Sequence, residues 1–416
     1  MQAVVLAGGN SSRFYPFNKE HKSFVKVLGK SIIEHTLISI KKSGIKDAVV
    51  VIKTEEAKRY VEKINPGLKL KFVLQKESLG MGDALLLSSK YLEEDFFLLH
   101  AHRVDFEVLK KELERIKKEK TDIVLSSRKV IETTDYQKMG ILRIKKGLVV
   151  EVVEKPKKNP PSEFGIVGVY LLNRNFIDVL KNTSKEHYNF EKAISDYAKK
   201  YCVRFEVVKN NMSFKYPWEI LSLKNYLLRN IRTDISKKAK ISKSAEILGE
   251  VVIEEGVQIM ENAVIKGPCF IGKNCFVGNN SVLRDGVDLE EGTVVGANME
   301  VKNTLIMDYS KTHSGFLGDS IIGKNCRIGA GFCSANVRLN RDSIKVKLGE
   351  EKIDTRAKSM GVIVGDGARI GMQSSSMPGI IIGRNVVVGP KTTVMNNIED
   401  NTKYYTKFQE VIIKKN

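Results

Sequence analysis

A glycine-rich segment near the start of the chain has the composition of an anion-binding loop. It reads Leu6-Ala7-Gly8-Gly9-Asn10-Ser11-Ser12-Arg13 and follows an apolar run. Successive small residues let backbone amides approach an anion, and Arg13 can add a positive charge beside a phosphate. Ordinary turns also use glycine, so the loop alone does not separate a phosphate site from a turn.

Histidines are the second group of residues suited to chemistry. His100 and His102 stand at i, i+2 at the end of an apolar run, a spacing that suits a transition metal, but no third ligand is evident. His313 lies far along the chain. An imidazole titrates near neutral pH and is therefore suited to act as a general base, although a loop histidine with a structural role fits the same pattern.

Short apolar runs alternate with helical periods up to about Leu228. These segments are 3–7, 32–42, 48–52, 55–64, 71–74, 82–92 and 96–99. Such alternation is typical of a mostly parallel sheet covered by helices. Ligands of such sheets bind beyond the carboxyl ends of the strands, so we expect the first site at the loops after Ala7, Leu74 and Leu99.

From Ile235 the pattern changes to a period of six residues. Every sixth residue from Ile235 to Val301 is aliphatic, and a second row of small or apolar residues is offset by four. Neither a simple strand nor a helix has this period, whereas a prism-like parallel β-helix with about six residues per face does. Cys269 and Cys275 fall in the second row, so we expect them to pack in the core.

The six-residue phase breaks after Val301 and resumes at Ile322, and it is interrupted again before Val364. Insertions of this kind leave a solenoid as loops, and loops on a rigid scaffold often have functional roles. We therefore expect two loops, Lys302–Ser320 and about 336–360.

The composition favours an anionic ligand. Lys and Arg number 69 against 49 Asp and Glu, which gives a net charge of +20. The basic residues are spread along the chain without zinc-finger spacing or a basic-region heptad, so we expect a phosphorylated small molecule and no nucleic acid.

The same features predict a cytoplasmic protein without membrane partners. The five cysteines form no CxxC pair, which is typical of reduced thiols. The N-terminus has no basic region before its apolar run, and no apolar run approaches the roughly 18 to 20 residues that span a bilayer.

Further motifs accompany the glycine-rich loop in the first half of the chain. They are Pro16, His21-Lys22-Ser23-Phe24, Gly29-Lys30-Ser31-Ile32-Ile33-Glu34-His35, Gln75 with Leu79-Gly80-Met81-Gly82-Asp83-Ala84, Glu151-Val152-Val153-Glu154-Lys155-Pro156, Gly168-Val169-Tyr170 and Tyr216-Pro217-Trp218-Glu219-Ile220-Leu221. With the loop, this series resembles the sugar-1-phosphate nucleotidyltransferases over residues 1–228.

The resemblance implies a Rossmann-like α/β nucleotidyltransferase domain over residues 1–230. Its reaction joins a sugar-1-phosphate to a nucleoside triphosphate, here dTTP or UTP, and releases pyrophosphate, with Mg²⁺ as cofactor. By the same resemblance Arg13 and Lys22 are catalytic and neutralise the phosphates. The implied nucleotide-binding residues are Leu6, Gly8, Gly9, Gln75 and Gly80, and the implied sugar-binding residues are Gly140, Glu154 and Lys155.

Two positions depart from the family pattern. Where the family has aspartates that bind magnesium, this chain has His102 and Ser213. Either Asp105 or Asp83 supplies a carboxylate from a shifted position, or metal use differs, or the domain binds a nucleotide without turning it over. The metal ligands are therefore left unassigned.

The second half resembles the left-handed β-helix of bifunctional sugar nucleotidyltransferase/amino-sugar-1-phosphate acetyltransferases. The segment Lys311-Thr312-His313-Ser314-Gly315-Phe316-Leu317-Gly318-Asp319 resembles the family's His-x-x-Tyr-x-Gly-Asp. The resemblance implies an all-β hexapeptide-repeat domain over residues 235–400, followed by a tail at 401–416.

The likeness also implies the acyl-transfer residues. His313 is the general base that deprotonates the amine attacking acetyl-CoA, and Asn336 and Lys345 bind the sugar phosphate. Phe316 replaces the usual Tyr, and Asp342 stands where a Lys is expected. Relatives with this domain form trimers that bind acetyl-CoA between neighbouring prisms, so we expect a homotrimer.

Two alternatives remain open. The chain could be an acyltransferase alone, with a degenerate nucleotide-binding first domain, because both metal aspartates are absent. It could also be a non-catalytic scaffold or regulatory subunit, as in the gamma and epsilon subunits of the eukaryotic initiation-factor exchange complex, which share this architecture. Arg13 and Lys22 would be unnecessary in a pure scaffold.

Overall fold

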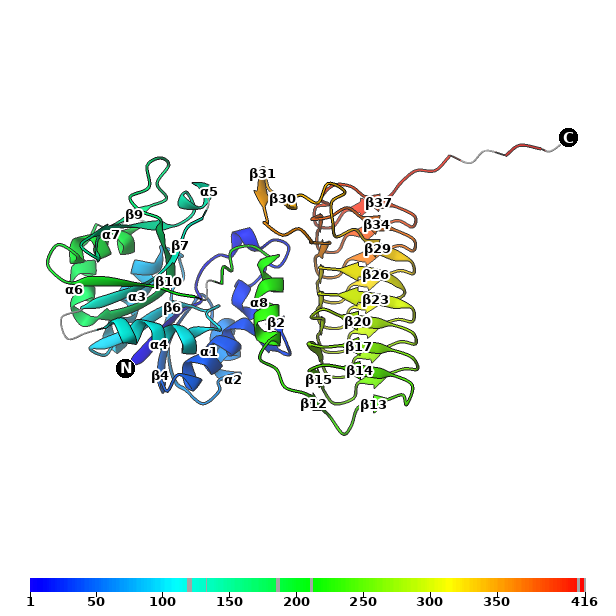
Figure 1. Cartoon of the computed structure of the whole chain (residues 1–416), viewed down its shortest axis with the longest axis horizontal. Helices are drawn as coiled ribbons and strands as arrows, with labels where there is room; N and C mark the ends of the chain where they lie inside the picture. Colours follow the sequence, from blue (N-terminus) through cyan, green and yellow to red (C-terminus); the bar gives the residue numbers. More distant parts are fainter. Residues whose placement is uncertain (118–121, 132, 185–187, 210–211, 410–411, 415–416) are drawn as a thin grey trace. The chain divides into compact units, whose positions relative to one another are not determined.

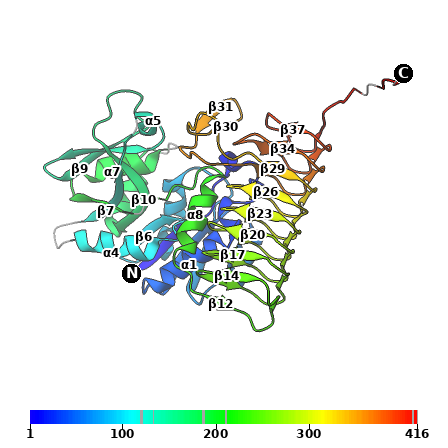
Figure 2. The same cartoon turned by 45° about the vertical axis from the view of Figure 1, so that its right-hand side comes forward.

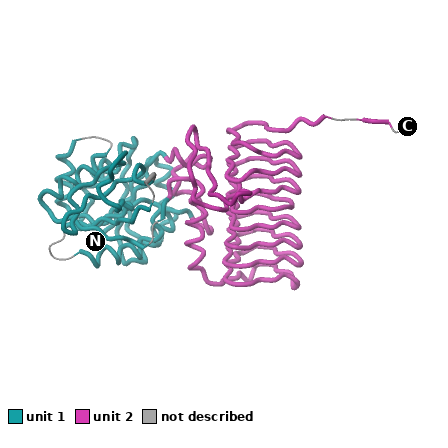
Figure 3. The backbone as a smooth tube through the Cα atoms, turned by 45° about the horizontal axis from the view of Figure 1, so that its top comes forward, with its two compact units in different colours: residues 1–10, 31–213 teal, residues 11–30, 214–416 magenta. Residues whose placement is uncertain are grey.

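The computed structural model describes residues 1–117, 122–131, 133–184, 188–209, 212–409 and 412–414. They form two compact units, residues 1–10 with 31–213 and residues 11–30 with 214–416, shown in teal and magenta in Figure 3. The units are not contiguous in sequence. The segment 11–30, which contains Arg13 and Lys22, belongs to the same unit as the β-helix, so the spatial units differ from a linear division near residue 230.

The first unit is built around a mixed sheet (Figure 1). Its strand order is β11-β7-β10-β6-β1-β4-β5. Its strands are β1 (Gln2–Leu6), β4 (Asp47–Ile52), β5 (Lys69–Leu74), β6 (Asp95–His100), β7 (Ile123–Lys129), β8 (Gly140–Lys145), β9 (Leu148–Glu154), β10 (Phe164–Asn173) and β11 (Val203–Val207). β1, β4, β5 and β6 are parallel, as expected from the alternating pattern. β10 runs antiparallel to β6 and β7.

Helices connect these strands and bury the apolar faces of the sheet. They are α1 (Ile32–Lys42), α2 (Glu55–Lys63), α3 (Met81–Ser88), α4 (Phe106–Ile116), α5 (Thr133–Tyr136), α6 (Arg174–Asn182) and α7 (Asn189–Tyr197), with a 3₁₀ turn η3 (Ser89–Tyr91). Polar N-cap residues fix where several of them begin: the side chains of Ser31, Thr54 and Asn173 each accept a hydrogen bond from a backbone amide of the first turn.

The second unit contains a parallel β-helix of three sheets, whose coils stack along one axis (Figure 2). Sheet I consists of β12 (Asp234–Ile235), β15 (Val251–Ile253), β18 (Cys269–Ile271), β21 (Asp288–Leu289), β24 (Leu305–Ile306), β27 (Ile321–Ile322), β32 (Ile363–Val364) and β35 (Ile381–Ile382). Sheet II consists of β13 (Lys240–Ile241), β16 (Gln258–Ile259), β19 (Phe276–Val277), β22 (Val294–Val295), β25 (Lys311–Thr312), β28 (Arg327–Ile328), β33 (Arg369–Ile370), β36 (Val387–Val388) and β38 (Lys403–Tyr404). Sheet III consists of β14 (Glu246–Leu248), β17 (Val264–Lys266), β20 (Val282–Arg284), β23 (Met299–Lys302), β26 (Gly315–Gly318), β29 (Phe332–Ser334), β34 (Ser375–Ser376) and β37 (Thr393–Val394).

From Ile253 onwards, the aliphatic rows predicted from the six-residue period form the core of this β-helix, whereas Ile235 on the first coil is 40% exposed. Ile253 pairs with Ile271, which pairs with Leu289, each on the next coil of sheet I. Every sixth residue from Ile253 to Val301 is at most 1% exposed. Cys269 and Cys275 are buried in the same cluster, so their predicted packing role is confirmed.

The prediction that Lys302–Ser320 leaves the solenoid as a loop was wrong. These residues form β24, β25 and β26. Leu289 pairs with Ile306, which in turn pairs with Ile322, so two shortened coils cause the break in phase. The second predicted loop is confirmed: Ile322 pairs directly with Val364, and the residues between include the hairpin β30 (Lys345–Leu348) and β31 (Glu351–Asp354).

From β18 to β35, the outer face of sheet I is also buried within the second unit. Its outward residues include Phe270, Leu305, Ile321, Ile363 and Ile381, all at most 4% exposed. The same unit contains η1 (Ser12–Phe14), η2 (Lys22–Phe24), β2 (Lys26–Val27) and α8 (Glu219–Leu228), while β3 (Lys30–Ser31) spans the junction between the units. A Cβ built on Gly29 would lie 3.0 Å from the ring of Phe270, and one on Gly286 would lie 3.5 Å from Leu228. The segment 11–30 and α8 therefore cover this face.

No helix in the described ranges is long and apolar enough to cross a bilayer.

Replacing Ile271 by Asp is expected to unfold the β-helix. Ile271 is fully buried in the core, and an unpaired buried carboxylate costs at least about 3 kcal/mol. Thermal unfolding followed by far-UV circular dichroism measures the loss. Gln258→Asp, at an exposed position of β16, is the control and should change stability by no more than about 0.5 kcal/mol. If Ile271→Asp melts as the wild type does, the core assignment is wrong.

Candidate functional sites

The glycine-rich loop and Gln75 lie together in the first unit. Leu6 ends β1, and Gln75 directly follows β5, at the same edge of the sheet. A Cβ on Gly8 would lie 3.0 Å from Gln75 Oε1, and Ser78 Oγ donates a hydrogen bond to the Gly8 carbonyl at 2.9 Å. Gly9 is exposed. The predicted nucleotide residues therefore meet at the carboxyl ends of parallel strands, where ligands of such sheets bind.

The orientation of the Gln75 amide is fixed by two acceptors. Its Nε2 donates to Asp83 Oδ2 at 2.7 Å and to the Gly80 carbonyl at 3.2 Å. Gln75 Oε1 then points towards Gly8, so the amide presents a defined edge. Asp83, one of the two shifted carboxylates considered as metal ligands, is engaged by Gln75.

The predicted sugar-binding residues also lie together. Lys155 Nζ lies 3.5 Å from Glu154 Oε1 and donates a hydrogen bond to Tyr188 Oη at 2.7 Å. A Cβ on Gly140 would lie 3.0 Å from Glu154 Oε2, so this glycine leaves room for the carboxylate. Burial by itself would lower the pKa of Lys155, but the hydrogen bond to Tyr188 and the charge of Glu154 raise it overall.

Glu191 is a further titratable residue at this place that the sequence analysis did not identify. It lies in α7, which packs against β9, the strand that ends in Glu154. Burial raises the pKa of Glu191 to about 7, and the negative charge of Glu154 contributes. The electrostatic interaction of Glu154 with Glu191 depends on the packing of α7 against β9, a non-local feature that no spacing in the sequence shows.

The two histidines after β6 lie side by side. The rings of His100 and His102 are stacked with their centroids 5.4 Å apart. Gly168 has φ +84°, and a Cβ there would lie 2.8 Å from His100 Cδ2, so only glycine fits at this close approach. Among the described residues, no group of three His, Cys, Asp or Glu side chains is placed to hold a metal ion.

The carboxylate that follows the histidines is buried in an ion pair. Asp105 is 1% exposed, and Arg103 Nη2 lies 2.7 Å from its Oδ2. Arg103 also donates to the backbone carbonyl of Met212 at 3.1 Å, and Ser213 is the next residue. Burial raises the pKa of Asp105 against the opposing effect of Arg103. Asp105 is thus paired with an arginine rather than open to a cation from solvent.

Arg13 and Lys22 belong to the second unit. Arg13 is exposed in η1, and the backbone amide of Lys22 donates to Ser11 Oγ at 3.0 Å. The Lys22 ammonium donates to the Phe214 carbonyl and lies 5.5 Å from the centroid of its ring. Burial lowers the pKa of Lys22 to about 8. The ammonium remains mostly charged at neutral pH, and its one hydrogen bond to a described residue leaves two N–H groups for an anion.

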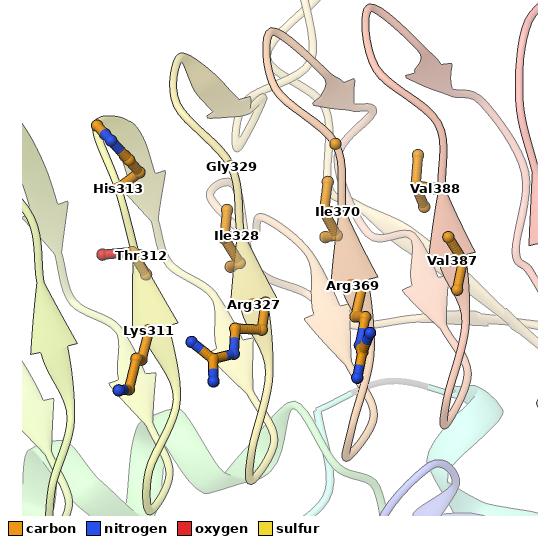
Figure 4. A pocket seen from close by; sticks show the side chains of 11 residues that line it. Lys311, Thr312, His313, Arg327, Ile328, Gly329, Arg369, Ile370, Val387 and Val388 are labelled. Atoms are coloured by element: carbon orange, nitrogen blue, oxygen red, sulfur yellow. The ribbon is translucent and has the colours of Figure 1, made fainter.

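A groove of about 420 Å³ lies beside His313 on the β-helix (Figure 4). Lys311, Arg327 and Arg369 line it from β25, β28 and β33, on successive strands of sheet II. Adjacent strands are about 4.8 Å apart, so three like charges are stacked, and such stacking is unfavourable without an anion nearby. None of the three pairs with an acidic side chain in the described ranges.

Asn336 and Lys345 do not line this groove. Asn336 Nδ2 donates to Asp319 Oδ2 at 2.6 Å, which places it at the corner where sheet III leads back to sheet I. His313 stands at the preceding corner, between β25 and β26. Lys345 is exposed on the hairpin. Within one chain, β26 therefore separates His313 from Asn336.

Comparison with known proteins gives the family. The model described as nucleotidyl transferase matches residues 2–219, and the model for the hexapeptide repeat of succinyl-transferase matches residues 268–301 and 361–389. The chain belongs to the nucleotidyl transferase family and combines that domain with hexapeptide repeats. The fold class expected from the sequence, a Rossmann-like domain followed by a left-handed parallel β-helix, is confirmed.

Relatives of the same length share both halves. The "Bifunctional protein GlmU" of Methanocaldococcus jannaschii is 31% identical over 424 residues, covering 100% of both chains. The "Bifunctional sugar-1-phosphate nucleotidylyltransferase/acetyltransferase" of Sulfurisphaera tokodaii is 28% identical over 96% of this chain and 98% of its own. A solved structure of UDP-glucose pyrophosphorylase complexed with UDP-glucose is 17% identical, covers 55% of this chain and 98% of its own, and has a TM-score of 0.44.

Glu191→Gln is expected to remove a pH-dependent loss of stability. Because the folded-state pKa of Glu191 is raised, the folded protein holds a proton that the unfolded chain releases as pH rises from about 4.5 towards 7. Glu191 therefore lowers the free energy of unfolding progressively over this interval. In thermal midpoints measured from pH 4 to 8, the midpoint of the variant minus that of the wild type should increase with pH up to about pH 7. Glu62→Gln, at an exposed position of α2, is the control; parallel curves for Glu191→Gln and the wild type would contradict the assignment.

Proposed function

We propose that the chain is a bifunctional enzyme that joins a sugar-1-phosphate to dTTP or UTP and acetylates an amino-sugar-1-phosphate. The observation that carries the first activity is the position of Gln75, which meets the glycine-rich loop at the carboxyl edge of the sheet. The full-length match to relatives with bifunctional names supports the pairing of the two activities. The proposed location is the cytoplasm.

In the first reaction an oxygen of the sugar-1-phosphate attacks the α-phosphorus of the nucleoside triphosphate, and pyrophosphate leaves. This displacement needs charge neutralisation more than covalent help. We assign Arg13 to the β- and γ-phosphates and Lys22 to the α-phosphate and the sugar phosphate. The low pKa of Lys22 reflects an incompletely hydrated ammonium, which interacts more strongly with a phosphate than a fully solvated one.

Recognition of the two substrates falls to residues of the first unit. Gln75, held by Gly80 and Asp83, offers a fixed amide edge that suits the pyrimidine of dTTP or UTP. Glu154 and Lys155 are assigned to the sugar hydroxyls, with Gly140 leaving space beside Glu154. Glu191 adds a second carboxyl group at the same place.

The described residues do not form a carboxylate site for Mg²⁺. His102 and Ser213 stand at the positions of the family aspartates, while Asp83 and Asp105 are engaged by Gln75 and Arg103. We therefore assign no resident magnesium site and propose that Mg²⁺ enters as the complex with the triphosphate.

In the second reaction His313 is the proposed general base for the amine that attacks acetyl-CoA. The stacked cations Lys311, Arg327 and Arg369 make the adjacent groove suitable for the phosphates of this donor. Asn336 and Lys345 are proposed to hold the sugar phosphate. Since Asn336 and His313 stand at different corners of the prism, a homotrimer in which one chain supplies each corner would complete the site.

The direct test is pyrophosphate release from the purified protein with Mg²⁺, across four nucleoside triphosphates and several sugar-1-phosphates including glucosamine-1-phosphate. Release that requires one pyrimidine nucleotide and one sugar supports the proposal. The absence of metal carboxylates favours a second candidate, an acyltransferase with a degenerate first domain. In that case no pair releases pyrophosphate, while acetyl-CoA is still consumed with the amino sugar.

Lys22→Ala is expected to lower the kcat of nucleotidyl transfer by ~10² to 10³-fold, because it removes a charge assigned to the reacting phosphates. Lys19→Ala is the matched control, an exposed lysine in the same segment. Acetyl transfer should be unaffected in both variants. Undiminished pyrophosphate release by Lys22→Ala would refute the assigned role.

His313→Ala is expected to lower acetyl transfer by ~10² to 10⁴-fold while nucleotidyl transfer stays at the wild-type rate. A thiol reagent that detects released CoA measures the first activity. His35→Ala, a histidine of α1 in the other unit, is the control. Loss of both activities in His313→Ala would mean that the substitution disrupts the fold rather than the chemistry.

A further inference from the structure

The segment 11–30, which contains Arg13 and Lys22, is held against the β-helix by polar contacts at two places. The first is near its start, where Tyr15 Oη donates to Asp400 Oδ1 at 3.0 Å. Arg384 orients the same carboxylate through Nε at 2.7 Å, and its Nη1 donates to Asn18 Oδ1 at 3.4 Å. Residues 385 positions apart in sequence thus form one polar cluster.

The second group of polar contacts lies at the end of the segment. Asp288 Oδ2 accepts from the backbone amide of Leu28, and Glu290 Oε1 accepts from that of Gly29, each at 2.9 Å. Lys26 Nζ pairs with Asp308 Oδ1, also at 2.9 Å. Asp288 and Glu290 lie on one coil of the β-helix and Asp308 lies on the next, whereas Lys26 and the two amides lie on the segment.

These contacts are largely shielded from water. Asp288 is fully buried, and Glu290 is 1% exposed. Burial raises the pKa of both carboxyl groups, that of Asp288 to about 7, and an oxygen of each accepts the backbone hydrogen bond. Removing either acceptor would leave a backbone amide of the segment without its partner. The buried cation Lys224 of α8 adds charge compensation beside Asp288 and donates to Asn303 Oδ1 at 3.1 Å. These contacts therefore have a specific geometry, and breaking one of them costs free energy of folding.

The shape of the β-helix matches the segment as well. A Cβ on Gly365 would lie 3.0 Å from Pro16, and one on Gly383 would lie 2.5 Å from Tyr15 Oη. The absence of side chains at these two turns lets the segment lie directly against the coils.

We propose that Asp288, Glu290 and Asp400 of the β-helix are positioning residues for nucleotidyl transfer. They hold the segment from both ends, so that Lys22 lies between two fixed points and Arg13 lies two residues before the first. The inference rests on the proposed phosphate-binding roles of Arg13 and Lys22. Its consequence is that the hexapeptide domain supports the chemistry of the nucleotidyl transferase domain as well as its own.

Four variants of the full-length protein test this role. Glu290→Ala removes the acceptor for Gly29, whereas Glu290→Gln keeps an amide oxygen in its place. Asp400→Ala removes the acceptor for Tyr15, and Tyr15→Phe removes the donor of the same bond. Glu261→Ala, an exposed glutamate elsewhere on the β-helix, is the matched control. The measurements are kcat and KM for pyrophosphate release, CoA release, and hydrogen–deuterium exchange of residues 11–30.

Glu290→Ala and Asp400→Ala should each lower kcat for pyrophosphate release at least tenfold, with a smaller change in KM. Glu290→Gln should stay within about threefold of the wild type, because it preserves the hydrogen bond. Amide exchange in residues 11–30 should accelerate in the alanine variants, and CoA release should be unchanged in all of them. In a double-mutant cycle, the effects of Tyr15→Phe and Asp400→Ala on kcat should be non-additive, since both substitutions remove the hydrogen bond between Tyr15 and Asp400.

Faster exchange in residues 11–30 with an unchanged kcat would overturn the positioning role, as would an unchanged exchange rate. If an alanine variant loses both activities and its thermal transition, it has unfolded. The positioning role is then tested by the kcat and amide exchange of Tyr15→Phe, because this variant deletes one hydroxyl from the segment and leaves the β-helix intact. If the wild-type enzyme releases pyrophosphate with any substrate pair, the proposed nucleotidyl transfer stands, and the variants then test the positioning role alone. If the wild type releases none with every pair, both the proposed nucleotidyl transfer and the positioning role are wrong.

Discussion

Burial of two inward rows of apolar side chains fixes the register of the β-helix, and the functional features of the second unit depend on that register. Because Ile253, Ile271 and Leu289 stack on successive coils, each outward position also recurs on the next strand. Lys311, Arg327 and Arg369 are thereby aligned in one groove, and the acids that hold the segment 11–30 are aligned on another face. A rigid repeat thus places side chains that are far apart in sequence at defined spacings.

The first unit follows a different constraint, the geometry of parallel strands. The carboxyl ends of β1, β4 and β5 meet at one edge, which brings the loop at Gly8 to Gln75. The packing of α7 on β9 brings Glu191 to Glu154. Recognition of base and sugar therefore depends on backbone topology, whereas the cations assigned to the phosphates belong to the unit that contains the β-helix.

Much of this could be predicted from the sequence where the physics is local or periodic. The six-residue period predicted the core from Ile253 to Val301, and the motif order predicted the residues that meet at Gln75 and Glu154. At Lys302–Ser320 the break in phase predicts an insertion where the structure has shortened coils, because a deleted turn residue and an added loop both shift the phase. Neither the hydrogen bond from Tyr15 to Asp400 nor the interaction of Glu191 with Glu154 was predictable, since each joins segments with no shared sequence pattern.

Phosphorus NMR on a single reaction shows whether one chain performs both transfers. The purified protein is mixed with UTP or dTTP, glucosamine-1-phosphate, acetyl-CoA and Mg²⁺. We expect the diphosphate resonances of a nucleotide sugar together with pyrophosphate, and an N-acetylated sugar in the product by mass spectrometry. Unchanged triphosphate and sugar phosphate resonances, with acetyl-CoA intact, would contradict this expectation.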